Sequence, residues 1–369
     1  MIKVAFVVKT LKPYRIPFFH LLQKNQEINS VFIFDKPPED YEKLLLLQNP
    51  IIYKTLRAFK LPSKLFLQKR YIRYFPLNLL NILNKFKPVI VFSPEYSIHT
   101  LQIVLYKYFY KTKIVIWSSL TKNDERISLP FQSNYRDFLR KRADAFVCYS
   151  HHSKEYLKSK NISEDKIFLV ENCTDVNYYL ENYNRQSRKN SIKYFNLLYV
   201  GALEEEKGIL DLFEALELLK EYRWNLTIAG KGNLKGVLFE LAEKKFKSRI
   251  NFTGEVKRNE LLKIYSESDI LVFPSHSDVW GHVIDEAMAS GCCVIASDQT
   301  ISALELIVQD KNGILYKAKE IDALKNELVK LFKHPNLINE LGKEAHLTML
   351  KHNESASIQG IKKAINYVF

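Results

Sequence analysis

Short apolar runs rich in β-branched and aromatic residues alternate with longer amphipathic stretches along the chain, and this alternation constrains the fold most strongly. The runs predict strands, and the stretches between them predict helices. Strand–helix alternation is typical of parallel sheets that carry helices on both faces. The pattern breaks at residues 181–190, which hold no aliphatic side chain, and then starts again. We therefore expect an α/β protein with two doubly wound, Rossmann-like domains.

The chain of 369 residues is long enough for two full-sized domains. We expect a first domain over residues 1–185, onto which a C-terminal helix near 353–369 packs back, and a second over 190–352. Ligands of such sheets bind beyond the carboxyl ends of the strands. If the two domains face each other, a cleft between them is the expected site. The expected strands lie near 2–8, 31–34, 89–92, 113–117, 145–149, 167–170, 196–200, 225–229, 250–253, 270–273 and 293–297.

Cysteine usage and hydropathy indicate a cytoplasmic protein. The four cysteines form no CxxC pair, which supports neither a zinc site nor a disulfide framework and fits a reducing compartment. No segment approaches the ~18 uninterrupted apolar residues of a membrane span. The opening MIKVAFVVKT has too short an apolar run for a signal peptide and is expected to be the first strand.

Positive charge is concentrated in the first half of the chain. Residues 1–190 hold 32 Lys and Arg against 16 Asp and Glu, whereas residues 191–369 hold 23 against 25. Residues 53–75 interleave cations with aromatic and leucine side chains, a mixture that can lie on anionic lipid. A solvated basic face is the alternative, and no nucleic-acid-binding signature favours nucleic acid as a partner. The candidate membrane contacts are Lys64, Lys69, Arg70 and Arg73.

Residues 270–297, ILVFPSHSDVWGHVIDEAMASGCCVIAS, contain a candidate anion site. A strand runs into a polar loop, Gly281 introduces a helix, and Gly291 ends that helix before the next strand. The first backbone N–H groups of a helix have no intrahelical partner and lie at the positive end of its dipole. The amides of Gly281, His282 and Val283 are therefore candidates for binding a diphosphate.

Charged side chains accompany this motif and a second one at 197–216. Asp278 precedes the helix and Glu286 lies within it, so both can accept hydrogen bonds from hydroxyls of one ligand. Taken alone, they could equally be a solvated loop acid and a helix-surface acid. In the second motif, a strand is followed by Gly201, an acidic loop and Lys207. Lys207 can offset the charge on a leaving phosphate, or it can simply neutralise the three glutamates before it.

These motifs, in this order, resemble the donor domain of GT-B glycosyltransferases, specifically the retaining family 4 of the glycosyl transferases group 1. The family pattern begins with a strand, Gly-Arg, a loop and Lys-Gly, followed by a strand ending in Pro-Ser. Two glutamates with seven residues between them come next, and then a Gly-x-Pro-Val-Ile-Ala-Ser strand. The resemblance covers residues 140–335 well and is faint before them. The matching residues are Gly201, Lys207-Gly208, Pro274-Ser275, Gly281, Glu286 with Ala-Met-Ala-Ser-Gly after it, and Val294 to Ser297.

The resemblance implies a role for each donor-site residue. Lys207 would bind the donor diphosphate, Glu286 the ribose hydroxyls and Asp278 a hydroxyl of the transferred sugar. Gly201 would lie beside the donor, and the amides of residues 281–283 would contact sugar and phosphate. The family also implies retention of anomeric configuration without a metal or cofactor, the nucleotide sugar being the co-substrate.

Three departures from the family pattern bear on activity. Asp278 replaces the first glutamate and reaches less far by one methylene. Ala202 stands where the family usually has arginine, and Arg15 could supply a phosphate or acceptor contact instead. The acceptor domain often carries a histidine after a middle strand, where this chain has Trp117 and Ser118. We assign no histidine a catalytic role.

We expect the protein to be a retaining glycosyltransferase of the hexosyltransferase type. The expected donor is a nucleotide sugar, specifically a UDP-sugar. The basic first half favours a membrane-associated, lipid-linked or saccharide acceptor, as in the assembly of bacterial surface polysaccharide or glycolipid; a soluble small-molecule acceptor is the alternative. The protein would then be peripheral at the inner face of the cytoplasmic membrane. One alternative is a non-catalytic GT-B protein that binds a nucleotide sugar or a partner transferase. Another is a GT-B enzyme that catalyses a different reaction, such as a sugar-nucleotide epimerase.

Overall fold

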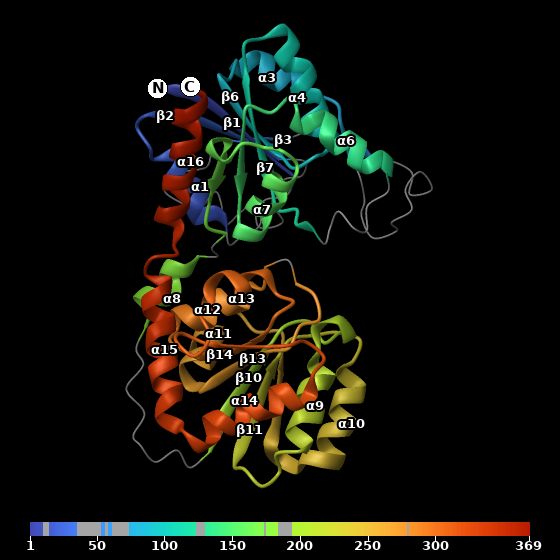
Figure 1. Ribbon diagram of the computed structural model, residues 1–369, viewed down its shortest axis with the longest axis vertical. Coiled ribbons are helices and arrows are strands. Elements are labelled where there is room, and N and C mark those ends of the chain that lie inside the picture. Colours follow the sequence, from blue (N-terminus) through green and yellow to red (C-terminus); the bar gives the residue numbers. More distant parts are fainter. Residues whose placement is uncertain are drawn as a thin grey trace. The chain divides into compact units, whose positions relative to one another are not determined.

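The chain folds into two compact units in the computed structural model, each with its own sheet (Figure 1). Unit 1 comprises Met1–Asn172 and Glu354–Phe369, and unit 2 comprises Cys173–Asn353. The structure describes residues 1–9, 15–34, 53–55, 58–60, 74–122, 130–172, 175–183, 194–278 and 280–369, with backbone only at 53–55, 58–60, 74–75 and 130.

Unit 1 is built on a parallel sheet of seven strands in the order β3-β2-β1-β6-β7-β8-β9. The order reverses between β1 and β6, which is the switch point of a doubly wound sheet. A separate antiparallel pair is formed by β4 and β5. The strands are β1 (Ile2–Val8), β2 (Ile28–Phe34), β3 (Tyr53–Thr55), β4 (Ala58–Lys60), β5 (Tyr74–Pro76), β6 (Ile90–Pro94), β7 (Lys113–Ser118), β8 (Ala145–Cys148) and β9 (Ile167–Leu169).

Helices cover both faces of this sheet because its central strands are apolar on both sides. One core cluster joins Phe19 and Leu22 to Ile361 and Ile365 near the end of the chain. The cluster on the other face includes Leu83, with further side chains from the neighbouring helices. The helices are α1 (Ile16–Gln23), α3 (Leu79–Phe86), α4 (Ile98–Phe109), α6 (Pro130–Arg140), α7 (His151–Ser159), the 3₁₀ turn η3 (Glu164–Lys166) and α16 (Glu354–Val368).

Unit 2 has a parallel sheet of six strands in the order β12-β11-β10-β13-β14-β15. Its order reverses between β10 and β13, so the switch point lies beside the first strand of the unit. The strands are β10 (Phe195–Val200), β11 (Trp224–Ala229), β12 (Ile250–Gly254), β13 (Ile270–Phe273), β14 (Cys293–Ser297) and β15 (Ile314–Tyr316).

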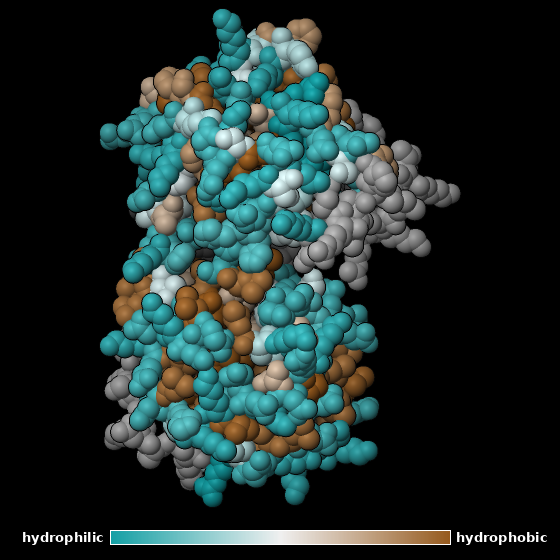
Figure 2. Space-filling view, viewed as in Figure 1, coloured by the Kyte–Doolittle hydropathy of each residue, from teal (hydrophilic) through white to brown (hydrophobic). Residues whose placement is uncertain are grey.

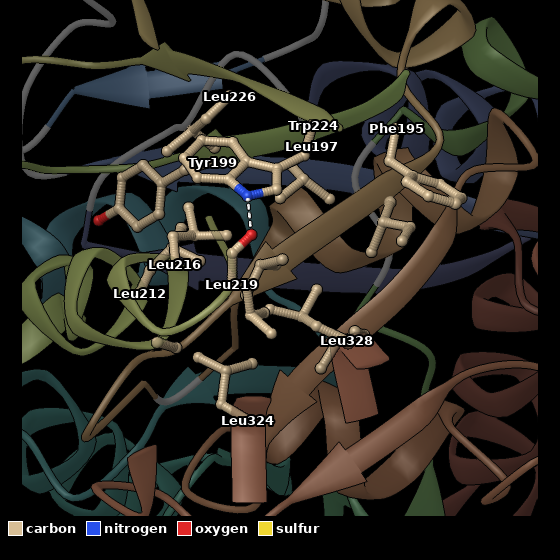
Figure 3. Close-up of a cluster of buried hydrophobic side chains, with 14 of the residues drawn as sticks. Phe195, Leu197, Tyr199, Leu212, Leu216, Leu219, Trp224, Leu226, Leu324 and Leu328 are labelled. Atoms are coloured by element: carbon tan, nitrogen blue, oxygen red, sulfur yellow. Dashed lines mark hydrogen bonds between the residues drawn. The ribbon is translucent and has the colours of Figure 1, made fainter. Parts of the chain in front are cut away.

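The core of unit 2 is centred on Trp224, which is fully buried between strands and helices (Figure 3). Its indole Nε1 donates a hydrogen bond of 2.9 Å to the carbonyl of Leu219, so burial leaves this polar atom satisfied. The helices are α8 (Val176–Glu181), α9 (Ile209–Glu217), α10 (Lys235–Phe246), α11 (Arg258–Glu267), α12 (His282–Ala289), α13 (Ile301–Leu306), α14 (Ile321–Lys333) and α15 (Pro335–Met349), with 3₁₀ turns η4 (Glu205–Lys207) and η5 (Lys247–Arg249).

The prediction of two doubly wound α/β units is confirmed. Residues 175–183, which the sequence suggested as part of the first domain, lie in unit 2 instead. The reason is packing: Val176 and Tyr179 of α8 belong to the buried cluster that includes Tyr265 and Ile284. Among the described residues, no helix is both long enough and apolar enough to cross a membrane. The candidate membrane contacts Lys64, Lys69, Arg70 and Arg73 lie outside the described residues.

Candidate functional site

A lysine and an aspartate from two different loops meet at the switch point of the unit 2 sheet. Lys207 follows β10 and ends η4, while Asp278 lies in the loop after β13. The ammonium Nζ of Lys207 lies 2.7 Å from Oδ2 of Asp278, and both side chains are about one-fifth exposed, at 21% and 20%. Ligands of doubly wound sheets bind at this position. The structure thus brings together two residues that the sequence predicted for one site.

The loop that carries Lys207 is pressed against the loop that carries Asp278. Gly208 has a φ of +65°, and a Cβ at this position would lie 1.9 Å from the carbonyl oxygen of Pro274. Only glycine fits there, because it adopts this φ without strain and has no Cβ. Two hydrogen bonds to the carbonyl of Glu206 tie the loops further: Ser275 Oγ donates at 3.3 Å and His276 N at 2.8 Å.

A histidine–aspartate pair connects the same loop to α9. Nε2 of His276 lies 2.7 Å from Oδ2 of Asp211, and both side chains are mostly buried. The sequence analysis did not identify this pair. The residues lie 65 positions apart, so no local pattern connects them. The pair holds the loop after β13 against the first turn of α9, one turn from Lys207.

Asp278 is fixed by its backbone as well as by its side chain. Its second carboxylate oxygen, Oδ1, accepts a hydrogen bond of 3.1 Å from the backbone N–H of Trp280. Its own N–H donates to the carbonyl of Gln299 at 3.2 Å, and its carbonyl accepts from Ile301 N at 3.2 Å. These bonds keep the carboxylate beside Lys207, where a hydroxyl or phosphate of a ligand would meet both.

The start of α12 is built around a buried acid. Gly281 caps the helix, and a Cβ there would lie 2.8 Å from the ring of Phe273. Asp285, only 1% exposed, accepts a hydrogen bond of 3.0 Å from Trp280 Nε1 and pairs with His282 Nδ1 at 3.1 Å. The sequence analysis gave His282 a role through its backbone amide only. The structure adds that Asp285 fixes its imidazole ring.

Glu286 lies in α12 and is partly buried among tyrosines. The hydroxyl of Tyr265, in α11, donates a hydrogen bond of 2.9 Å to Oε2 of Glu286. Tyr179 of α8 contacts the same carboxyl group. The pKa of Glu286 is raised from 4.5 to about 7, mainly by burial; the hydrogen bond from Tyr265 opposes this shift and the neighbouring Asp285 carboxylate adds to it. The group therefore titrates near neutral pH, and as a carboxylate it can only accept hydrogen bonds.

Two residues after β10 that the sequence analysis named, Gly201 and Ala202, form hydrogen bonds through their backbone. Gly201 ends β10 at the close approach to β11, and its N–H donates to the carbonyl of Ala229 at 3.0 Å. The carbonyl of Ala202, at the position where the resembling family has arginine, accepts a hydrogen bond of 2.7 Å from Tyr199. Val283 follows His282 in the first turn of α12, where backbone N–H groups have no intrahelical acceptor.

Arg15 belongs to unit 1. It precedes α1, and its guanidinium donates hydrogen bonds to the hydroxyl of Tyr149 and, at 3.3 Å, to Oδ1 of Asn172. The guanidinium also lies 5.8 Å from the ring of Trp117. Arg15, Tyr149 and Asn172 come after β1, β8 and β9, and Trp117 is the penultimate residue of β7. These residues therefore gather at the carboxyl edge of the unit 1 sheet. A contact of Arg15 with donor or acceptor stays a prediction.

In the described parts of the chain, no cluster of three or more His, Cys, Asp or Glu side chains is arranged to hold a metal ion. Metal independence also stays a prediction.

Comparison with known proteins shows which family unit 2 resembles. Residues 182–348 match the model of glycosyl transferases group 1. The matching segment includes Lys207, Asp278 and Glu286. The resemblance inferred from the sequence is confirmed, while the assignment to the retaining family 4 stays a prediction.

Curated relatives match the chain over part of its length. A glycosyltransferase of Methanocaldococcus jannaschii is 33% identical over 130 residues, which are 35% of this chain and 33% of that protein. The glycogen synthase of Mycobacterium tuberculosis is 35% identical over 35% of this chain and 31% of that protein. The chain thus spans about a third of the length of these relatives. A capsular polysaccharide biosynthesis glycosyltransferase of Staphylococcus aureus is 22% identical over 54% of this chain and 55% of that protein.

Solved structures match the whole chain in fold. The apo form of the lipopolysaccharide outer core galactosyltransferase WaaB has a TM-score of 0.78 at 19% identity. The match covers 100% of this chain and 100% of that chain. Anabaena HepE in complex with UDP-glucose has a TM-score of 0.72 at 14% identity, with 99% of this chain and 100% of that chain covered. At these identities the likeness establishes the fold, which is that of GT-B glycosyltransferases.

Proposed function

We propose that the protein is a glycosyltransferase that moves a sugar from a nucleotide sugar to a saccharide acceptor. The observation that carries the proposal is the Lys207–Asp278 pair at the switch point of the unit 2 sheet, inside the segment that matches the family model. A cation and a hydroxyl-binding acid at one position suit a ligand that has both phosphates and a sugar. UDP-glucose in one structural neighbour supports a UDP-sugar as the donor.

In the proposed site each residue contributes a different interaction. Lys207 exchanges its partner Asp278 for the donor diphosphate and holds the negative charge that develops on the leaving nucleotide. Amides at the start of α12, from residues 281–283, donate to the same phosphates. Asp278 then accepts from a hydroxyl of the transferred sugar, and the carboxylate of Glu286 accepts from the ribose hydroxyls.

The finer points of the proposal are the stereochemistry, the acceptor and the location. We propose retention of anomeric configuration, with the donor phosphate accepting the proton of the acceptor hydroxyl, so that no separate base is needed. The excess of basic residues in 1–190 supports an acceptor linked to an anionic membrane. The capsular polysaccharide and lipopolysaccharide relatives support surface polysaccharide or glycolipid assembly. The protein would then act at the cytoplasmic face of the membrane.

A non-catalytic donor-binding protein is the second candidate. Ala202 removes one of the two cations of the family pattern, and Asp278 is paired with the other, Lys207. If this pair does not open for a diphosphate, the site binds a nucleotide sugar weakly and without transfer. Binding and turnover therefore have to be measured separately.

The test is a thermal-shift screen against UDP-, GDP-, ADP- and CMP-sugars and the free nucleotides, followed by a transfer assay with the base that binds. A ligand at 100 times its dissociation constant adds about 2.7 kcal/mol to stability. We expect a shift with one base that is lost in Lys207→Ala and kept in Lys244→Ala, an exposed lysine of α10. No shift with any nucleotide, in folded protein, would refute donor binding. A shift without transfer or hydrolysis across an acceptor panel would favour the non-catalytic alternative.

A further inference from the structure

The helical layer formed by α3, α4 and α6 exposes large apolar side chains to solvent. The other side of this layer packs on the unit 1 sheet, so these side chains are not part of the core. In Figure 2, brown and tan apolar side chains lie scattered on the mainly hydrophilic surface of the upper part of the view, where Figure 1 places these helices. The exposed residues of the layer are Leu77 (61%), Leu80 (40%), Leu105 (47%), Tyr108 (69%), Phe109 (83%), Tyr110 (40%), Phe131 (64%) and Phe138 (40%). We call them the apolar face of unit 1.

Helix α4 shows that this exposure follows the helical period. Ile103 and Val104 are buried against the sheet, whereas Leu105, Tyr108 and Phe109 lie on the opposite side. Residues three and four apart share one side of a helix, so these three form a continuous outward stripe. The helix is therefore apolar on both sides: one side packs on the sheet, and the other is exposed to solvent.

Helix α6 extends the face, and direct contacts join it to α4. Phe131 and Phe138 lie seven residues apart on one side of α6, while Leu139 is fully buried. The guanidinium of Arg142 lies 3.6 Å from the ring of Phe138, and its Nε donates to the hydroxyl of Tyr108 at 3.3 Å. The aromatic residues of the two helices are thus neighbours. Contiguous apolar patches on a protein surface mark sites of interaction.

The charges around the apolar face are mainly positive. Residues 77–113 and 130–144 contain nine Lys and Arg against three acids. Two of the acids are neutralised locally, because Asp144 pairs with Lys107 at 2.6 Å and Asp137 pairs with Arg140. Exposed lysines lie near the ends of the three helices: Lys85, Lys87, Lys111 and Lys141.

We propose that the apolar face of unit 1 docks on an anionic lipid bilayer. Aromatic and leucine side chains enter the interface between headgroups and acyl chains, and the lysines around them bind lipid phosphates. The proposal deepens the proposed function, on which it rests for a membrane-linked acceptor, by naming the surface that meets the membrane.

A second copy of the chain is a poorer occupant of this face. In a two-fold dimer the same patch meets itself, so the exposed lysines of one copy would face those of the other. Like charges brought together in this way repel, whereas a layer of anionic headgroups attracts every one of them. The outward faces of three neighbouring helices also form a broad surface, which suits a bilayer better than a groove-binding peptide.

The test measures binding of the full chain to vesicles without donor or acceptor. Co-sedimentation with vesicles of phosphatidylcholine and phosphatidylglycerol is compared with phosphatidylcholine alone. The apolar variant is Tyr108→Ser with Phe109→Ser, and the charge variant is Lys111→Glu with Lys141→Glu. The matched control is Phe239→Ser, whose side chain is 54% exposed in α10 of unit 2. Thermal unfolding confirms that each variant is folded.

We expect binding to anionic vesicles that weakens with salt, falls at least about tenfold in the apolar variant and is unchanged in Phe239→Ser. The charge variant should lose at least about fivefold for each lysine replaced, because every Lys→Glu change removes a positive charge and adds a negative one. Absence of vesicle binding, or equal binding by the wild type and the apolar variant, would overturn the proposal. So would a dimer in analytical ultracentrifugation that the apolar variant dissociates. The nucleotide-sugar thermal shift is independent of this face, so failure of the proposed function and failure of the docking surface are told apart.

Discussion

Replacing Glu286 by glutamine should make the protein more stable at neutral and alkaline pH while weakening donor binding. Glutamine has the shape of glutamate but cannot ionise, and its carbonyl can still accept the hydrogen bond from Tyr265. The wild-type carboxyl is held partly buried, where ionisation is unfavourable, and its pKa is raised to about 7. We therefore expect Glu286→Gln to remove a destabilising charge from α12. It also replaces one of the two acceptor oxygens by an NH2 donor, which weakens binding of the ribose hydroxyls.

The size of the effect follows from the pKa shift. Below pH 4.5 the carboxyl is protonated in both folded and unfolded chains, so it contributes nothing to the pH dependence. Between pH 4.5 and 7 the unfolded chain loses this proton and the folded chain keeps it, so the free energy of unfolding falls. At about 1.36 kcal/mol for each unit of pKa difference, the wild type loses at most about 3 kcal/mol above pH 7.

The assay is thermal or urea unfolding of wild type and Glu286→Gln between pH 4.5 and 8.5, with Glu243→Gln as the control. Glu243 is an exposed glutamate of α10. The stability difference between wild type and Glu286→Gln should grow with pH and level off above pH 7, whereas the control should follow the wild type. Donor affinity of the wild type should rise about tenfold from pH 6 to pH 8 as the carboxylate forms. A stability difference that is constant with pH, or that favours the wild type at pH 8, would refute the reasoning.

Three further substitutions test the site and the fold. Lys207→Ala should lower kcat by roughly 10²–10³ with little change in Tm, as for loss of one stabiliser of leaving-group charge; a tenfold or smaller effect would mean a structural role. Gly208→Ala should destabilise by more than about 1 kcal/mol in urea unfolding, because its Cβ would meet the carbonyl of Pro274 at a φ of +65°. Gly360→Ala should destabilise by about 1–3 kcal/mol, because its Cβ would lie 2.3 Å from the carbonyl of Leu169; full stability of either variant would contradict the packing described.

The strands of the sheets could be predicted from the sequence because each central strand is a short apolar run buried on both faces. The expected strand at 270–273 coincides with β13, and the expected helix at 282–290 differs from α12 by one residue. The short edge strand β15, Ile314–Tyr316, has too few residues for a periodic signal and was missed.

The candidate site was only partly predictable, because the sequence indicates the residue types but not which side chains meet in the folded chain. The residue types and their places after strands pointed to Lys207, Asp278 and Glu286, yet their partners are set by tertiary structure. Lys207 and Asp278 are 71 positions apart, and Glu286 is bonded to a tyrosine 21 positions away. Asp285 was overlooked because an acid inside an amphipathic helix is usually exposed. Its buried carboxylate has two partners: Trp280, which the loop before the helix brings to it, and His282, three residues earlier in α12.

The placement of α16 in unit 1 has a consequence for the order in which the protein is made. Unit 2 is complete once residue 353 has been synthesised, whereas unit 1 still lacks residues 354–369. Until then, the side chains of Phe19 and Leu22 that α16 covers remain open to water. During synthesis, unit 1 is therefore begun before unit 2 but can be completed only after it. All of unit 2 is synthesised between the two segments that make up unit 1.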